Sequence, residues 1–246
     1  MSRVLKLVLA ASLVGNLAIV WVGYKAYQYR THINYWLDKY TEVVEEFSGR
    51  SRYRQDNERL RSDTAVPGRV VFLGTQVISR WDVGRSFPRW EAIDRGVAGQ
   101  RLAGMLLRFQ PDVLDLGPEA VVIEISSYNF RPEWPVRELE DYAESMADLA
   151  RARGVAPIIG SVIPPWDADL GLGDYAIRDS IAAFNEWLQQ GMAEGRWQVA
   201  DFHGALADGE GYLRRELAAE SIDPNRAGYE RMTAAVDSVL GRALGR

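Results

Sequence analysis

The sequence predicts an α/β fold, in which a parallel β-sheet lies between two layers of helices, preceded by an N-terminal transmembrane helix. An uncharged apolar run lies near the N-terminus, and short apolar runs then alternate with helical periodicity along the chain. Strands that alternate with helices favour right-handed crossovers, which cover a parallel sheet on both faces. We therefore expect a three-layer α/β/α sandwich at residues 66–246, after a membrane anchor at 1–30 and an amphipathic helical linker at 31–65.

The membrane anchor is predicted from residues 7–24, which contain no charged side chain. This length is near the lower limit for crossing a bilayer. A cleaved signal peptide is the alternative, but Trp21, Val22 and Tyr24 stand where small residues mark a cleavage site. Trp21 and Tyr24 suit a membrane interface instead. We expect an uncleaved anchor that contacts the membrane through residues 7–24 and holds the body on the periplasmic or extracellular side.

An amphipathic helix is expected directly after the anchor. Apolar side chains recur there at three- and four-residue spacing, at Ile33, Trp36, Leu37, Tyr40, Val43, Val44 and Phe47. Such a stripe must pack against another surface. The body of the protein is the expected partner, and self-association is the alternative. Pro67-Gly68 marks the start of the α/β domain.

Five apolar runs are the strand candidates of this domain. They lie at 70–74, 92–97, 120–125, 157–163 and 197–202. Helical periodicity fills the intervals between these runs. The first and last apolar residues of each predicted helical face are Leu102 and Phe109, Leu139 and Leu149, Ile177 and Leu188, and Tyr229 and Leu240. In such sheets the functional site lies at the carboxyl ends of the strands.

Composition excludes several kinds of chemistry. The chain has no Cys, its two His are His32 and His203, and its last Lys is Lys39. The body therefore lacks a cysteine nucleophile, a zinc-thiolate site, a catalytic lysine and a His-rich metal site. We expect no metal and no cofactor. The net charge of -5 also argues against nucleic acid as a partner, because counterion release needs a basic face.

Four blocks of the α/β domain resemble the SGNH/GDSL hydrolases, a family of serine esterases and acylhydrolases. VVFLGTQVISRW resembles the first block, a strand followed by Gly-Asp-Ser, and DRGVAGQRLAGMLLRF resembles the second. AVVIEISSYNF falls where the third block has Gly-x-Asn-Asp, and ESIDPNRAGYERM resembles the last, Asp-x-x-His-Pro-Asn. The order and spacing agree over residues 69–240. The resemblance implies the SGNH-hydrolase, flavodoxin-like sandwich.

The resemblance also implies a mechanism whose reactive residues this sequence has replaced. In the family, a Ser attacks an ester carbonyl, a His takes its proton, and backbone amides and an Asn hold the oxyanion. Here Gly99 is retained, but Gln76 replaces the Ser and Asp223 replaces the His. The other pocket positions of the motifs hold Thr75, Ser126, Tyr128 (at the oxyanion Asn), Asn129 and Glu220.

Some of these residues have an alternative interpretation as a rearranged catalytic site. The Thr75 hydroxyl stands one residue before the lost Ser, and Asn129 one residue after the oxyanion Asn. His203, after the fifth strand, is the candidate replacement base. Glu220 and Asp223 are either a carboxylate pair or cap the final helix, and we favour Asp223 as the N-cap before Pro224.

Aromatic residues also occur in loops near the mapped pocket. They are Trp81, Phe87, Trp90, Trp134 and Trp166, a composition typical of either a sugar-binding surface or a hydrophobic lid. The function we expect is that of a membrane-anchored pseudoenzyme of the bacterial envelope, which binds an acylated glycan or an envelope protein. The alternative is an active esterase, acylhydrolase or acyl transferase with a non-standard site. A third hypothesis is a structural role through the Ile33–Phe47 helix.

Overall fold

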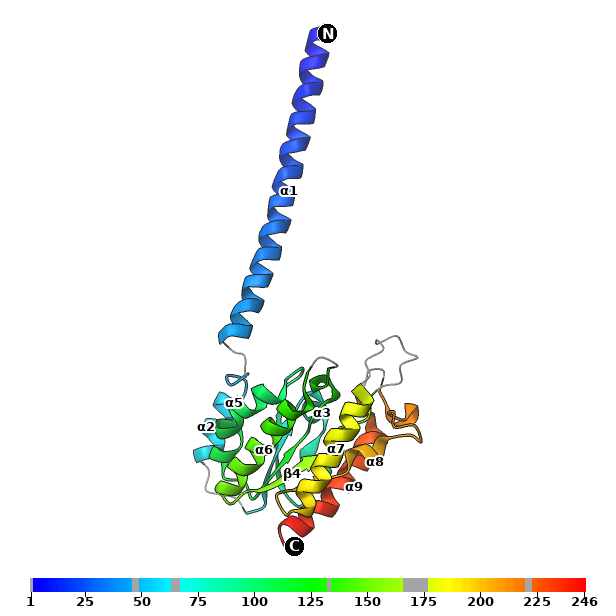
Figure 1. The fold of residues 1–246 in the computed structure, drawn as a ribbon. Helices are drawn as coiled ribbons and strands as arrows, with labels where there is room; N and C mark the ends of the chain where they lie inside the picture. Colours follow the sequence, from blue (N-terminus) through cyan, green and yellow to red (C-terminus); the bar gives the residue numbers. More distant parts are fainter. Residues whose placement is uncertain (1, 46–48, 63–66, 132–133, 166–176, 220–222) are drawn as a thin grey trace. The chain divides into compact units, whose positions relative to one another are not determined.

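The computed structural model describes residues 2–45, 49–62, 67–131, 134–165, 177–219 and 223–246 (Figure 1). The chain divides into two units, Met1–Phe47 and Ser48–Arg246. Glu220 and Trp166, two residues singled out in the sequence, lie outside the described residues.

The first unit is a single helix, α1 (Arg3–Glu45). Its segment Arg3–Tyr40 is long and apolar enough to cross a membrane, with a mean hydropathy of 2.0 in its most apolar window. The predicted N-terminal helix is therefore present, and it continues past residue 30 without a break. Ile33, Trp36 and Tyr40 are exposed on it. The surface that would cover this stripe stays a prediction, and the side chains of Val43, Val44 and Phe47 are outside the description.

The second unit contains a five-stranded parallel sheet with the strand order β2-β1-β3-β4-β5. Its strands are β1 (Arg69–Gly74), β2 (Glu91–Gly96), β3 (Ala120–Ile123), β4 (Ala156–Gly160) and β5 (Gln198–Ala200). All five predicted runs thus form strands. Because β1 is buried on both sides, its sequence is a continuous apolar run rather than an alternating one.

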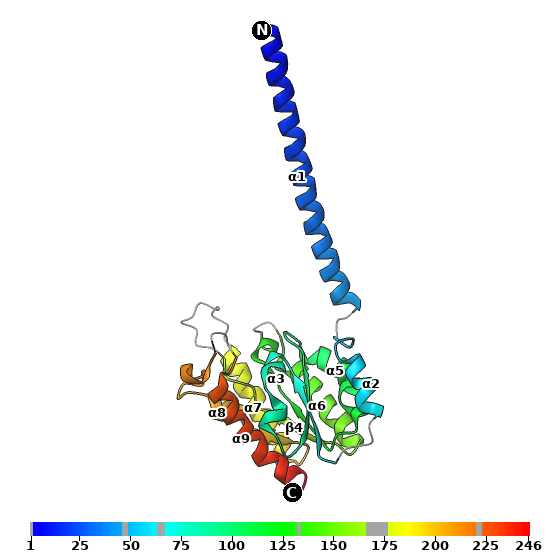
Figure 2. The same ribbon diagram turned by 180° about the vertical axis from the view of Figure 1, so that it is seen from behind.

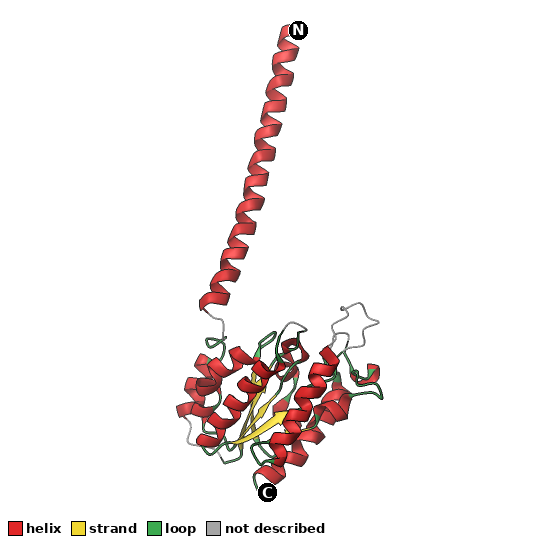
Figure 3. Ribbon diagram, viewed as in Figure 1, coloured by secondary structure: helices red, strands yellow, loops and turns green. Residues whose placement is uncertain are grey.

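Helices cover both faces of this sheet, as Figure 3 shows by colour. On one face lie α5 (Leu102–Asp112), α6 (Val136–Ala152) and α7 (Ile177–Ala193), whose buried residues pack with Val71 and Leu73 of β1. On the other lie α3 (Gln76–Arg80), α4 (Val83–Ser86), α8 (Phe202–Leu206) and α9 (Arg226–Ala243), which pack with Val70 and Phe72 (Figure 2). The predicted three-layer sandwich is confirmed.

The helix α2 (Arg54–Ser62) comes from the segment predicted as a linker, but it packs into the sandwich. Leu60 belongs to the core on the α5 side, and the Asn57 amide donates to Asp112 Oδ1 at 2.6 Å. Asp112 Oδ2 in turn accepts from Arg108 Nη1 at 2.9 Å, with both side chains fully buried. Arg108 also donates to the side chain of Gln100 and to the carbonyl of Arg95. This network fixes α2 and α5 to the end of β2.

Candidate functional site

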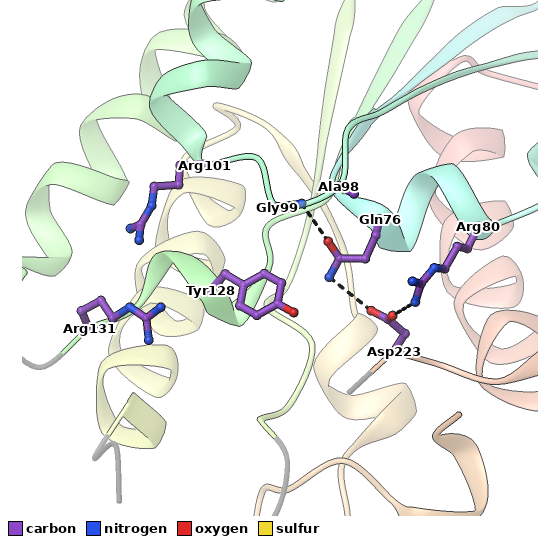
Figure 4. A pocket seen from close by; sticks show the side chains of 8 residues that line it. All are labelled: Gln76, Arg80, Ala98, Gly99, Arg101, Tyr128, Arg131 and Asp223. Carbon is purple, nitrogen blue, oxygen red and sulfur yellow. Dashed lines mark hydrogen bonds and ion pairs between the residues drawn. The ribbon is translucent and has the colours of Figure 1, made fainter. Parts of the chain in front are cut away.

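A cavity of about 470 Å³ opens at the carboxyl ends of β1, β2 and β3, where the fold predicts a site. Its lining residues are Gln76, Arg80, Ala98, Gly99, Arg101, Tyr128, Arg131 and Asp223 (Figure 4). The structure therefore brings together four motif positions far apart in the sequence: Gln76, Gly99, Tyr128 and Asp223. The three arginines were not predicted.

Gln76 lies at the start of α3, and its buried amide connects two sides of the cavity. Its Oε1 accepts the backbone N–H of Gly99 at 3.1 Å, and its Nε2 donates to Asp223 Oδ1 at 3.3 Å (Figure 4). Gly99 has a φ of +71°, a conformation that glycine adopts without strain. Gln76, at the nucleophile position, therefore accepts from the Gly99 backbone N–H, the donor with which the family stabilises an oxyanion.

The close approach of these segments depends on Gly96 at the end of β2. A Cβ atom at this position would lie 2.3 Å from the backbone nitrogen of Ser79 in α3. No side chain fits in that space, so the glycine allows α3 to lie directly against β2. This contact brings Gln76 within reach of the loop that carries Gly99.

Asp223 is buried, and it does not cap the final helix. Its Oδ1 accepts from Gln76, and its Oδ2 accepts from Arg80 Nη1. The N-cap is Asn225, whose Oδ1 accepts the N–H of Gly228 at 3.1 Å, and α9 begins at Arg226. Our preferred cap was therefore wrong. The Asp223 carboxylate is instead neutralised by the Arg80 guanidinium. The Asn225 side chain caps the helix with its oxygen, and its amide nitrogen donates to the carbonyls of Glu216 and Ala218.

Thr75 is completely buried and is not among the residues that line the cavity. Its hydroxyl donates to Glu124 Oε2 at 2.8 Å, and its backbone N–H donates to the same oxygen at 2.7 Å. Burial raises the pKa of Glu124 to about 7, against the opposing effect of these two hydrogen bonds. The Thr75 hydroxyl is thus used in the core, away from the position of the lost serine.

Ser126 and Asn129 shape the loop after β3. Ser126 Oγ accepts the N–H of Tyr128 at 3.3 Å, which caps the short helix η2 (Ser127–Asn129). The Asn129 amide donates to the Ser126 carbonyl at 3.1 Å, and its Oδ1 accepts the N–H of Leu102 at 3.0 Å. Asn129 therefore holds the first turn of α5 and does not replace the oxyanion Asn. Tyr128 lines the cavity with 37% of its surface exposed.

His203, the candidate replacement base, lies in α8 and is not among the residues lining the cavity. Its Nδ1 lies 3.0 Å from the carbonyl oxygen of Val162, so this nitrogen carries the proton and donates it. Its backbone N–H donates to Ser161 Oγ at 2.8 Å. The Nδ1 hydrogen bond holds the imidazole against the loop after β4, a strand that lies two positions from β1 in the sheet.

The aromatic residues divide into core and surface. Trp81 and Phe87 are buried and pack with Phe72 under α3 and α4, so they belong to neither a sugar platform nor a lid. Trp90 packs against the same core. Trp134 is 40% exposed, and the guanidinium carbon of Arg101 lies 4.0 Å from its ring centroid.

Arg101 and Arg131 form a cationic end of the cavity that the sequence motifs did not reveal. Arg101 Nη1 is buried and has no hydrogen-bond partner among the residues that the structure describes. Burial lowers the pKa of the Arg101 guanidinium, and the charge of Arg131 lowers it further. The only sequence signal was position: both residues follow motif residues closely, after Gly99 and after Asn129.

The chemistry available in the cavity follows from its lining. Gln76 has no ionisable group, and the phenol of Tyr128 is the only hydroxyl among the described lining residues. Within the described ranges, no group of three or more His, Cys, Asp or Glu side chains is placed to hold a metal ion. The described lining therefore offers hydrogen-bond donors, positive charge, the Asp223 carboxylate and one aromatic surface.

Comparisons with known proteins agree with this fold. The sequence model of the GDSL-like Lipase/Acylhydrolase family matches residues 73–231. A GDSL-like lipase from Bacteroides thetaiotaomicron has a similar structure, with a TM-score of 0.72 and 24% identity over 80% of this chain and 99% of that one. A candidate acylhydrolase from Bacteroides fragilis has a TM-score of 0.69 and 24% identity, over 79% of this chain and 96% of that one.

A more distant structural relative has a printed substrate class. An acetyl-xylooligosaccharide esterase from Geobacillus, in a mutant form, has a TM-score of 0.56 and 14% identity, over 74% of this chain and 96% of that one. At these identities the structural likeness shows the fold alone. Among curated proteins, none matches this sequence.

Proposed function

Because the chain belongs to the GDSL-like lipase/acylhydrolase family but carries Gln76 at the position of its nucleophile, we propose that it binds a ligand in the cleft without serine catalysis. In this proposal it is a membrane-anchored protein of the bacterial envelope. Its ligand is an acylated glycan or a similar envelope component, presented free or on a protein partner.

The hydrogen bonds of Gln76 are the observation that carries this proposal. The Gly99 N–H, which would stabilise an oxyanion in an active relative, is already bonded to Gln76 Oε1. Asp223, at the position of the base, contacts both Gln76 and Arg80.

The alternative of a rearranged catalytic site has little geometric support. It requires a hydroxyl and a base that meet in the cavity. The Thr75 hydroxyl instead donates to Glu124 in the core, and the His203 Nδ1 proton is bonded to the carbonyl of Val162. Neither residue lines the cavity.

An activity assay tests the absence of serine catalysis. The full chain, in a nonionic detergent, is incubated with p-nitrophenyl acetate and butyrate and with a fluorophosphonate probe. We expect hydrolysis at the rate of buffer alone and no labelling. Turnover that Thr75→Ala or Asp223→Asn abolishes would instead identify an active enzyme with a rearranged site.

A binding assay tests the use of the cleft. We expect acetylated xylo-oligosaccharides to bind the full chain in equilibrium dialysis, because a distant structural relative is an esterase of such glycans. Tyr128→Ala removes the aromatic surface of the cavity and should weaken binding about tenfold. Tyr212→Ala, a change outside the cavity lining, is the matched control. Equal losses in both variants would contradict binding in the cleft.

The absence of Cys allows a direct test of membrane orientation. Asp148 lies exposed on α6, and Ser2 is exposed before α1. We expect a membrane-impermeant maleimide to label Asp148→Cys in intact cells, but to label Ser2→Cys only after lysis. Labelling in the reverse pattern would place the body inside the cell and exclude an envelope ligand.

A further inference from the structure

Arg101 and Arg131 lie at the end of the cavity away from Gln76 and Asp223, and Tyr128 lies between the two groups (Figure 4). Arg101 immediately precedes α5, and Arg131 follows η2 by two residues. The Asn129 side chain joins these two segments, because it accepts from Leu102 and donates to Ser126. Both arginines are therefore carried on backbone that hydrogen bonds hold together.

The described lining offers Arg101 no carboxylate at this end of the cavity. Asp223 is the only carboxylate among the described residues that line it, and its Oδ2 contacts Arg80 at the other end. Arg101 makes no ion pair with any residue that the structure describes, and its Nη1 is buried without a hydrogen-bond partner. A buried donor without an acceptor is unfavourable, so an acceptor oxygen that reaches this nitrogen would be stabilising.

The surroundings of Arg101 also disfavour its positive charge in the absence of an anion. The Trp134 ring stacks against its guanidinium at 4.0 Å and keeps water from one face. Burial and the charge of Arg131 both lower the pKa of Arg101, which means that both disfavour its charged form in the empty cavity. An anion between the two guanidinium groups would remove this penalty.

We infer that Arg101 and Arg131 bind an oxyanion group, a carboxylate or a phosphate, carried by a sugar whose ring lies over Tyr128. The planar guanidinium fork matches both groups through paired hydrogen bonds. The inference rests on the proposed function, since it names the chemical class of the ligand for the same cleft. An acidic sugar fits this arrangement, because the two guanidinium groups and the Tyr128 ring line the same cavity (Figure 4).

Titration calorimetry on the full chain in nonionic detergent tests the inference. The probes are tri-galacturonate, its neutral methyl ester, glucose 1-phosphate and free glucose. We expect at least one acidic probe to bind about tenfold or more tightly than its neutral counterpart, because hydrogen bonds to charged groups are stronger than neutral ones. Tighter binding of tri-galacturonate than of its methyl ester would identify a carboxylate as the bound group. Tighter binding of glucose 1-phosphate than of glucose would identify a phosphate.

Variants connect the binding to the two arginines. Arg101→Gln and Arg131→Gln should each weaken the acidic probe about tenfold, whereas Arg131→Lys should keep part of the affinity through its charge. Arg137→Gln, an exposed position at the start of α6 and outside the cavity, is the matched control. A thermal unfolding curve for each variant separates lost binding from lost folding.

Three results would overturn the inference: equal binding of acidic and neutral probes, unchanged affinity in folded Arg101→Gln and Arg131→Gln proteins, or no binding of either acidic probe at millimolar concentration. If neutral acetylated glycans still bind, and Tyr128→Ala alone reduces their affinity, the inference fails but the proposed function stands. If esterase turnover is found, the non-catalytic function fails whatever the charge of the ligand.

Discussion

Arg108 lies on α5 and Arg101 immediately precedes this helix, yet the surroundings of the two arginines differ. Arg108 is completely buried and contacts the carboxylate of Asp112, the amide of Gln100 and the carbonyl of Arg95. Arg101 stacks on Trp134 and leaves a buried nitrogen without a partner in the described part of the chain. The fold itself neutralises the first arginine, whereas the second is directed to the cavity. Pairing within the fold, together with complete burial, therefore separates the structural arginine from the ligand-binding one.

The largest expected effect on stability is at Arg108, the arginine that is paired within the fold. Asp112→Ala removes the carboxylate from Arg108 and the acceptor from Asn57, and it leaves a buried charge without compensation. We expect the free energy of unfolding to fall by about 3–5 kcal/mol. Urea denaturation of the full chain, followed by tryptophan fluorescence, measures this change.

Asp115→Ala is the matched control for that experiment. Asp115 also pairs with an arginine, Arg61, but both side chains are partly exposed. Exposed ion pairs contribute about 0–1 kcal/mol, so this variant should remain close to the wild type. Equal losses in the two variants would mean that the buried network has no special structural role.

The second largest effect on stability is expected at Glu124, a buried carboxyl with no cationic partner among the described residues. Its Oε1 has no hydrogen-bond partner among the described residues, and burial raises its pKa from 4.5 to about 7. The folded protein therefore holds this proton in a pH range where the unfolded chain has released it. Stability from this group is full below about pH 4.5 and is lost as the pH rises through about 7.

The comparison with Glu124→Gln isolates this group, because the variant keeps every other titrating side chain. Between about pH 4.5 and 7.5, the stability of the wild type relative to the variant should fall by about 3 kcal/mol. Urea unfolding of both proteins at several pH values gives the difference. Two parallel stability curves would show that Glu124 ionises normally in the fold.

A smaller effect is expected at Asn129, which supports the cavity without charge. Asn129→Ala removes the acceptor for the N–H of Leu102 at the start of α5, at a cost of about 1–2 kcal/mol. Asn129→Asp keeps an acceptor oxygen at the same place and should recover most of the loss. If Asn129→Ala is as stable as the wild type in urea, this hydrogen bond does not hold the loop that carries Arg131.

The fold was predictable because its signals are local. The run from Val70 to Gly74 is apolar throughout, as a strand buried on both faces requires, and each helical face has its own periodicity. The positions of Gln76, Gly99, Tyr128 and Asp223 followed from the motifs after the strands. Their assembly around one cavity is a consequence of the parallel sheet, whose carboxyl ends share one edge.

The partners of individual side chains were not predictable in the same way. Asp223 and Asn225 are both good N-cap residues, and the choice depended on Arg80, a residue distant in sequence. The sequence around the start of α9 does not indicate the contact between Arg80 and Asp223. Arginine side chains are long, so the sequence does not show which guanidinium enters the core, as in Arg108, and which lines the cavity, as in Arg101.

The smallest expected effect, and the most discriminating one, is on the stability of Arg101→Gln. Removing a guanidinium loses its contact with Trp134, which is worth about 0.5–1 kcal/mol, but it also ends the repulsion from Arg131 and the cost of a buried, unbonded nitrogen. These contributions oppose one another, so the free energy of unfolding should stay within about 1 kcal/mol of the wild type. Urea denaturation without an added anion measures it. A loss as large as that of Asp112→Ala would mean that Arg101 has a structural partner, and the distinction between the two arginines would then fail.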